Sequence, residues 1–135
     1  MMISAVTCMA VAIYFEARNQ PIAGQLAVAQ VVNNRVVSKH YPDTVCEVIR
    51  QGPVHVSGHP VKHRCQFSFF CDGKREDITD RDAWRTAIRI SATVRDTSSP
   101  QIDVSEGATH YHTTGVSPKW RYTMRKTVQI GHHIF

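Results

Sequence analysis

The sequence lacks any long hydrophobic run. The longest, residues 8–15, contains eight apolar residues and stops at Glu16. A transmembrane helix needs about 20 consecutive apolar residues, so we expect no membrane span. The N-terminus also lacks the basic start and small-residue cleavage site of a signal peptide, so we expect no export signal in this chain.

The sequence also has no long run of basic residues, although it carries 16 Lys and Arg against 11 Asp and Glu. A net charge of +5, with eight histidines that add charge at acid pH, favours anionic partners such as nucleic acid, acidic lipid or a bacterial wall polymer. No four basic residues are consecutive, and no arginine-rich arm occurs. We therefore expect no nucleic-acid binding.

Cysteine is sparse: the four residues are Cys8, Cys46, Cys65 and Cys71. Outside a reducing cytoplasm they allow two disulfides in three pairings, among which the sequence does not choose. Four buried free thiols fit the pattern equally well.

Repeats and low-complexity segments are absent, and 135 residues suit one domain over residues 1–135. Apolar periodicity predicts a helix ending near residue 18 with Ser4 or Thr7 as its cap, and a second helix with Pro21 in its first turn. A later helix starts with a capping box at Thr79. The predicted segments are helices over 4–18, 21–38 and 80–95, a short helical turn over 44–51, a long loop over 52–73, and strands over 108–112 and 127–130. The expected fold class is α+β, mainly helical, with a small C-terminal β-hairpin.

Glu16 is unusual for its position, because it ends a helix that is apolar on every side. Such a helix is expected to be buried, and a carboxylate at its end is then partly desolvated. Desolvation raises the pKa of a carboxyl group and keeps it protonated near neutrality, as a general acid requires. The alternative is that Glu16 faces water at the helix end. An ion pair with Arg18 is not expected, because residues two apart do not face each other on a helix.

Eight segments of the sequence carry a recognisable pattern, which begins with AIYFEAR around Glu16 and continues to the C-terminus. They are residues 12–18, 24–35, 44–46, 65–69, 71–73, 107–112, 118–120 and 130–135. In these segments, and in their order, the sequence resembles the spore-cortex-lytic, or SleB-type, cell-wall hydrolase family.

This resemblance implies a lysozyme-like, lytic-transglycosylase-like fold and action on the glycan strands of peptidoglycan, with Glu16 as the catalytic glutamate. It does not carry over specificity for spore cortex. We expect a monomer without cofactor or metal that acts at the bacterial cell wall. Without an export signal, we expect delivery during phage lysis or a chain that has been truncated.

Cleavage of a glycosidic bond conventionally uses two carboxylates. Candidate partners for Glu16 are Asp72, Asp77, Asp80, Asp103 and Glu106, of which Asp80 is better explained as a helix-start residue. A route with one carboxylate has Glu16 protonate the bond and then deprotonate the sugar's own 6-hydroxyl, which forms a 1,6-anhydro product. The resemblance favours this lytic route over hydrolysis by a muramidase.

A sugar-binding groove needs aromatic platforms and neutral hydrogen-bonding groups. The expected platforms are Phe67, Tyr111 and Trp120, with Phe69 and Phe70 as further candidates. The expected hydrogen-bonding side chains are Gln25, Gln66, Ser68 and Thr109. For Phe67, Phe69 and Trp120, however, core packing is the favoured explanation. Tyr111 is favoured because strand alternation turns it away from the histidines on either side.

Three rival functions remain open. His110 and His112, with His132 or His133, have the composition of a zinc site, which would indicate an amidase or peptidase. Cys8 with His110 as its base would indicate a cysteine enzyme. A wall-binding module without activity is the third, but it does not explain Glu16.

Overall fold

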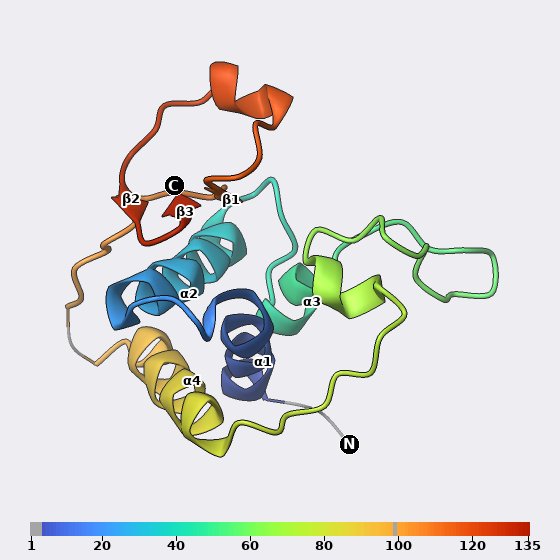
Figure 1. Ribbon diagram of the computed structural model, residues 1–135, viewed down its shortest axis with the longest axis horizontal. Helices are drawn as coiled ribbons and strands as arrows, with labels where there is room; N and C mark the ends of the chain where they lie inside the picture. Colours follow the sequence, from blue (N-terminus) through green and yellow to red (C-terminus); the bar gives the residue numbers. More distant parts are fainter. Residues whose placement is uncertain (1–3, 99) are drawn as a thin grey trace.

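Helix α1 (Ala5–Ala17) is the buried centre of the molecule. This computed structural model describes residues 4–98 and 100–135. The Ser4 side chain caps α1 by accepting a hydrogen bond from the Thr7 backbone N–H, so Ser4 is the cap of the two that were predicted. Seven residues of α1 are buried, and the other three α-helices surround it (Figure 1). The prediction of a helix buried on every side is therefore met in part, since the remaining six residues of α1 are half-buried and none is exposed.

Helices α2 (Ile22–Val37) and α4 (Arg81–Arg95) flank α1. Pro21 immediately precedes α2 instead of lying in its first turn. The Asp80 side chain caps α4 through the backbone N–H of Ala83, so the cap is Asp80 and not the predicted Thr79. The hydroxyl oxygen of Tyr14 accepts hydrogen bonds from the N–H groups of Thr79 and Asp80, which ties the start of α4 to α1.

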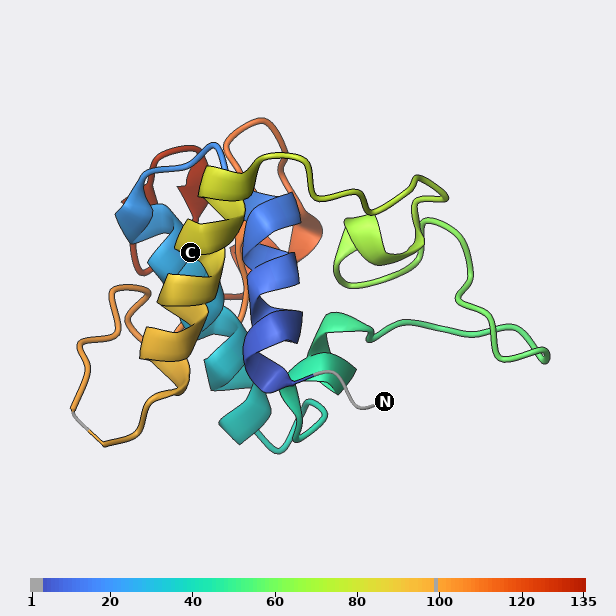
Figure 2. The ribbon, with the colours of Figure 1, turned by 90° about the horizontal axis from the view of Figure 1, so that it is seen from below.

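The segment between the short helix α3 (Val45–Ile49) and α4 is mostly irregular, as predicted. It holds an isolated bridge between Val54 and Pro60 and the 3₁₀ helix η1 (Ser68–Cys71). Figure 2 shows residues 52–64 projecting away from the helices.

Two disulfides settle the cysteine pairing that the sequence left open. Cys8–Cys46 joins α1 to α3, and Cys65–Cys71 closes a short loop around η1. The alternative of free buried thiols is therefore wrong.

The C-terminal segment contains a three-stranded sheet instead of the predicted two-stranded hairpin. Strands β1 (His112–Thr113), β2 (Gln129–Ile130) and β3 (His133–Ile134) pair antiparallel in the order β1-β3-β2, and the 3₁₀ helix η2 (Lys119–Tyr122) lies between β1 and β2. Gly131, at a φ of 57°, provides the left-handed turn between β2 and β3.

The predicted strand over 108–112 is wrong except at its last residue. The reason is that side chains of α2 bind the carbonyl oxygens that a strand would offer to its neighbour. Asn34 donates to the carbonyl of Ala108, and Arg35 donates to the carbonyl of Thr109.

The expected α+β, mainly helical class is confirmed. In the described residues, no helix has the length and apolar character needed to cross a membrane.

Candidate active site

Glu16 lies in the last turn of α1, at the wall of a cleft of about 320 Å³. The hydroxyl of Tyr111 donates a hydrogen bond to Oε2 of Glu16 at 3.2 Å. The lining residues come from α1, α2, the segment around η1 and the C-terminal segment; they are Glu16, Arg35, Gln66, Phe67, Ser68, His110, Tyr111, His112, Thr113, Val116, Trp120 and His133.

The pKa of Glu16 is raised above its ordinary value of 4.5. Burial is the largest cause, because it penalises the carboxylate, while the hydrogen bond from Tyr111 and the charge of Arg35 partly oppose it. The protonated form is therefore favoured over a wider pH range, as a general acid requires. After the proton has left, Tyr111 and Arg35 stabilise the carboxylate, so the same group can act next as a base.

Arg35 also lines the cleft, although it was not among the predicted site residues. It is only 6% exposed, on α2, and its Nε donates to the carbonyl of Thr109 at 2.7 Å. The guanidinium carbon lies 5.0 Å from the ring centroid of Tyr41 and 5.5 Å from that of Phe67. A buried arginine between two rings places a positive charge in the cleft near Glu16. The available sequence indication was a polar Asn-Asn-Arg stretch near the end of an otherwise apolar helix.

The C-terminal wall is built from stacked rings. The ring of His133 lies 4.9 Å from that of Tyr111, and Phe135 packs against both rings. His133 is 3% exposed, and its Nδ1 has no hydrogen-bond partner within the described ranges. Burial lowers the pKa of His133, with His132 as a second cause, so the neutral ring predominates at neutral pH. This packing holds the Tyr111 ring beside Glu16.

Trp120, on η2, lies between two histidines in the same wall. Its ring centroid is 5.0 Å from that of His110 and 5.5 Å from that of His112. Trp120 is half-buried and lines the cleft, so part of its indole is open to that space.

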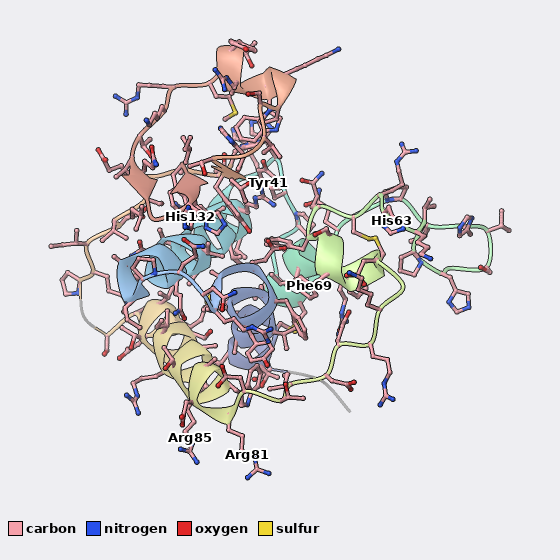
Figure 3. All side chains as sticks on the ribbon, in the orientation of Figure 1. Tyr41, His63, Phe69, Arg81, Arg85 and His132 are labelled. Atoms are coloured by element: carbon pink, nitrogen blue, oxygen red, sulfur yellow. A yellow bond between two sulfur atoms is a disulfide. The ribbon has the colours of Figure 1, made fainter. Side chains whose placement is uncertain are left out.

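The structure brings most of the predicted binding residues to Glu16. Gln66, Phe67, Ser68, Tyr111 and Trp120 line the cleft. Phe67 also serves the core, since it is 2% exposed and packs near Phe69. Figure 3 shows Phe69 beside α1, where its ring stacks on Phe15 as the core interpretation expected.

Two predicted residues are not among those that line this cleft. Gln25 is buried and donates to the carbonyl oxygen of Gln20. The Thr109 carbonyl holds Arg35, and the Thr109 hydroxyl shares a hydrogen bond with His110. These contacts indicate that Gln25 and Thr109 position the cleft wall and do not line the cleft.

A second hollow, of about 380 Å³, also reaches Glu16. Its lining residues are Phe15, Glu16, Ala17, Arg18, Asn19, Gln20, Asp77 and Thr79. Among the carboxylates considered as partners, Asp77 lines this hollow, whereas Asp80 caps α4 and Asp103 accepts hydrogen bonds from Asn34, Ser105 and Gly107. Open space therefore adjoins Glu16 in two places, which suits an extended polymer.

The structure contradicts the thiol alternative, because Cys8 is bonded to Cys46 and offers no thiolate. For the zinc alternative, no group of three or more His, Cys, Asp or Glu that could hold a metal occurs within residues 4–98 and 100–135.

Comparison with known proteins places these features in a family. Residues 19–135 match the Cell Wall Hydrolase family; Glu16 lies just before this range. The chain is 34% identical over 128 residues to a spore cortex-lytic enzyme of Halalkalibacterium halodurans and 29% identical over 127 residues to one of Bacillus cereus. Each alignment covers 94% of this chain, but only 33% and 42% of those relatives, so the chain spans less than half their length.

Two solved structures are similar over nearly the whole chain. The catalytic domain of the SleB protein of Bacillus cereus has a TM-score of 0.66 at 28% identity, covering 97% of this chain and 88% of that one. The catalytic domain of the germination-specific lytic transglycosylase SleB of Bacillus anthracis has a TM-score of 0.68 at 30% identity, covering 97% and 92%. The predicted lysozyme-like fold is confirmed, and the chain belongs to the Cell Wall Hydrolase family.

Proposed function

We propose that this chain cleaves the glycan strands of peptidoglycan, with Glu16 as both acid and base. One observation carries the proposal: Glu16 lies in an open cleft, where burial raises the pKa of its carboxyl group and Tyr111 donates to it. The names of the relatives, spore cortex-lytic enzymes and a lytic transglycosylase, support the same chemistry. The expectation of a monomer stays a prediction.

In the proposed reaction, protonated Glu16 gives its proton to the glycosidic oxygen, and the bond to the sugar's C1 breaks. Tyr111 and Arg35 stabilise the carboxylate that forms. That carboxylate then takes the proton of the 6-hydroxyl of the same sugar, while the oxygen bonds to C1. Because the nucleophile is tethered, its effective concentration is high, and the product ends in a 1,6-anhydro ring.

The other cleft residues would hold the strand. Trp120 and Tyr111 would face the apolar sides of sugar rings, while Gln66 and Ser68 would bind hydroxyl or acetamide groups. The ring of Phe67 would pack against the guanidinium of Arg35. Thr109 and Gln25 would position the cleft wall through their bonds with Arg35 and with the Gln20 carbonyl.

Hydrolysis is the second candidate, and Asp77 is the observation that favours it. This carboxylate lines the hollow on the other side of Glu16, where a base could activate water. Asp77 is already paired with Arg75 at 3.3 Å, and more than half of its side chain is exposed, so neither burial nor a second partner fixes it toward Glu16.

Mass spectrometry of the products from purified peptidoglycan tests the proposal. We expect muropeptides that end in 1,6-anhydro sugars, no products with Glu16→Gln, and full activity with Asp77→Asn. Reducing ends together with loss of activity in Asp77→Asn would establish hydrolysis. Intact glycan with cut peptide bonds would refute glycan cleavage.

A further inference from the structure

The positive charge of this protein is concentrated in its C-terminal segment. Residues 107–135 contain four Lys and Arg residues and no Asp or Glu, so they carry four of the five net positive charges. The four cations are Lys119, Arg121, Arg125 and Lys126, and all are exposed. In the part of the chain that the structure describes, none of them forms an ion pair.

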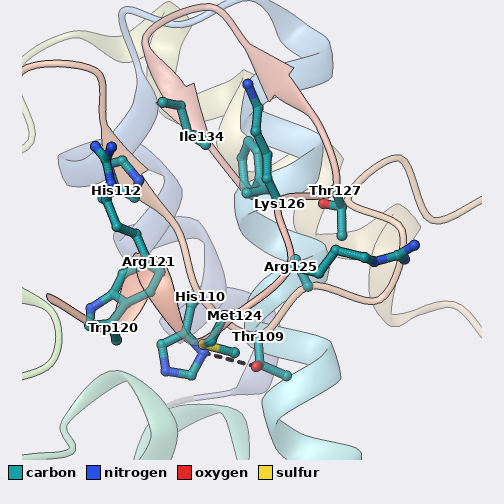
Figure 4. Close-up of a pocket in the computed structure, with 12 residues that line it drawn as sticks. Thr109, His110, His112, Trp120, Arg121, Met124, Arg125, Lys126, Thr127 and Ile134 are labelled. Atoms are coloured by element: carbon teal, nitrogen blue, oxygen red, sulfur yellow. Dashed lines mark hydrogen bonds between the residues drawn. The ribbon is translucent and has the colours of Figure 1, made fainter. Parts of the chain in front are cut away.

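Three of these cations surround a small pocket of about 70 Å³. Its interior is mostly apolar and includes Met124, Ile134 and Phe135. Arg121, Arg125 and Lys126 lie around its edge, and their charged ends point outward in different directions (Figure 4). The pocket therefore combines an apolar floor with a cationic rim.

This pocket adjoins the active-site cleft. His110, His112 and Trp120 line both, so the stacked rings around Trp120 form the wall between them. A group attached to a sugar in the cleft would have to cross only this wall to reach the pocket.

We propose that this pocket binds the peptide stem of the glycan strand: a small alanine side chain occupies the apolar floor, and stem carboxylates meet Arg121, Arg125 and Lys126. The inference rests on the proposed function, because the stem is carried by the muramoyl sugars of the strand that would occupy the cleft. It makes the peptide-bearing strand, and not bare glycan, the preferred substrate.

The shape of the pocket favours a peptide carboxylate over the phosphate of an anionic wall polymer. A phosphate diester would leave the apolar floor unfilled, whereas an alanine methyl group fits it and removes apolar surface from water. Guanidinium groups bind carboxylates in a bidentate manner. The stem is also attached to the cleaved strand itself, while phosphate polymers are attached only at scattered sites.

Binding to matched glycan strands tests the proposal without requiring cleavage. Strands freed of phosphate polymers are used with their peptide stems, and again after an amidase has removed the stems. Equilibrium binding is measured in the Glu16→Gln protein. We expect the peptide-bearing strands to bind about tenfold more tightly at low salt, because each exposed ion pair contributes modestly, and we expect the preference to shrink at high salt.

We expect the affinities for the two kinds of strand to become nearly equal when the three cations are replaced in the Glu16→Gln background, as Arg121→Gln/Arg125→Gln/Lys126→Gln. The matched control is Arg81→Gln/Arg85→Gln/Arg89→Gln, which removes three charges from α4 and should keep the preference. Figure 3 shows Arg81 and Arg85 at the opposite end of the molecule from the C-terminal segment. Arg121 also bonds to Ser117, so the double variant Arg125→Gln/Lys126→Gln serves if the triple variant does not fold, with a loss of about threefold.

The proposal would be overturned if the Glu16→Gln protein bound the two kinds of strand with equal affinity. It would also be overturned if the triple and double variants kept the full preference for peptide-bearing strands. A preference that appears only when phosphate polymer is left on the strands would overturn it as well. The proposed function is judged separately. If the protein binds peptide-bearing strands more tightly but leaves glycan uncut, glycan cleavage alone is refuted. If it cuts peptide-bearing and stem-free strands equally, the stem pocket alone is refuted.

Discussion

The two walls of the cleft are built in different ways. One wall is helical: α1 carries Glu16, α2 carries Arg35, and both helices pack in the core. The other wall is the C-terminal segment, whose three strands have two residues each. Both walls nevertheless hold side chains firmly, since His133 in the second wall is as buried as Arg35 in the first.

The difference shows how a segment with little secondary structure of its own becomes ordered. Polar side chains of α2 bind its backbone: Gln30 bonds to Ile102 and Val104, Asn34 to Ala108, and Arg35 to Thr109. These bonds satisfy backbone groups that a longer sheet would otherwise pair. The C-terminal wall thus depends on α2, whereas the helical wall is held by apolar packing and by Cys8–Cys46.

The largest effect is expected from the disulfides, which lie in different parts of the molecule. Removing Cys8–Cys46, which closes 38 residues, should cost about 4 kcal/mol of unfolding free energy; removing Cys65–Cys71, which closes 6, should cost about 2 kcal/mol. Urea unfolding of Cys8→Ala/Cys46→Ala and of Cys65→Ala/Cys71→Ala measures both.

For glycan cleavage, we expect the loss of Cys65–Cys71 to have a larger effect than the loss of Cys8–Cys46. The Cys65–Cys71 loop contains Gln66, Phe67 and Ser68 of the cleft, so its removal should lower glycan cleavage more at a temperature where both variants are folded. Equal losses of stability, or a larger loss of activity in Cys8→Ala/Cys46→Ala, would contradict this division.

Arg35 tests the link between the walls. Arg35→Met removes the bond to Thr109 and leaves a partly buried carbonyl unpaired, which should cost about 2 kcal/mol of unfolding free energy. Arg35→Lys is the control: it keeps the charge beside Glu16 but not the planar contacts with Tyr41 and Phe67, so it should recover part of the activity and little of the stability. Calorimetry and cleavage rates separate the two. Full stability in Arg35→Met would mean that the bond from Arg35 to Thr109 is not needed and that Gln30 and Asn34 of α2 suffice to hold the C-terminal wall.

The sequence predicted the helical wall better than the C-terminal wall, for a physical reason. The apolar run before Glu16 is local information, and it correctly indicated a buried helix that ends in a desolvated carboxylate. The strand predicted over 108–112 also followed local alternation. Its backbone, however, is bound by Asn34 and Arg35, more than 70 residues earlier in the chain, and no local pattern encodes such a contact.

The same reasoning explains which site residues were found. Tyr111 was favoured as a sugar platform because of its alternation with His110 and His112; the structure places its hydroxyl on Glu16, a contact that was not predicted. Arg35 and His133 were missed as parts of the cleft, because the burial of a charged or titratable residue depends on the fold. The cationic C-terminal segment is recognisable in the sequence because no Asp or Glu follows Glu106, although its four basic residues are not all consecutive.

Tyr111→Phe should have a moderate effect that is confined to chemistry. Loss of the hydroxyl removes the hydrogen bond that stabilises the Glu16 carboxylate, so the pKa of Glu16 rises further. We expect the cleavage rate to fall about tenfold, and the alkaline limb of the pH–rate profile to move to higher pH, because the acid form persists longer. The ring and its packing on His133 remain, so Tm should change little. An unmoved alkaline limb would mean that the proton donor is not Glu16.

The smallest effect is a pH-dependent difference in stability between the wild type and Glu16→Gln. Burial raises the pKa of Glu16 in the folded state above its ordinary value of 4.5, so the folded protein binds this proton more tightly than the unfolded chain does. The resulting stability is fully present below the unfolded pKa and is lost as the pH rises through the folded pKa. Glutamine does not ionise, so the Tm of the variant relative to wild type should be lowest at about pH 3 and should increase toward neutral pH. A difference in Tm that is constant across this range would mean that the carboxylate faces water, and the helical wall would then lose its role in tuning Glu16.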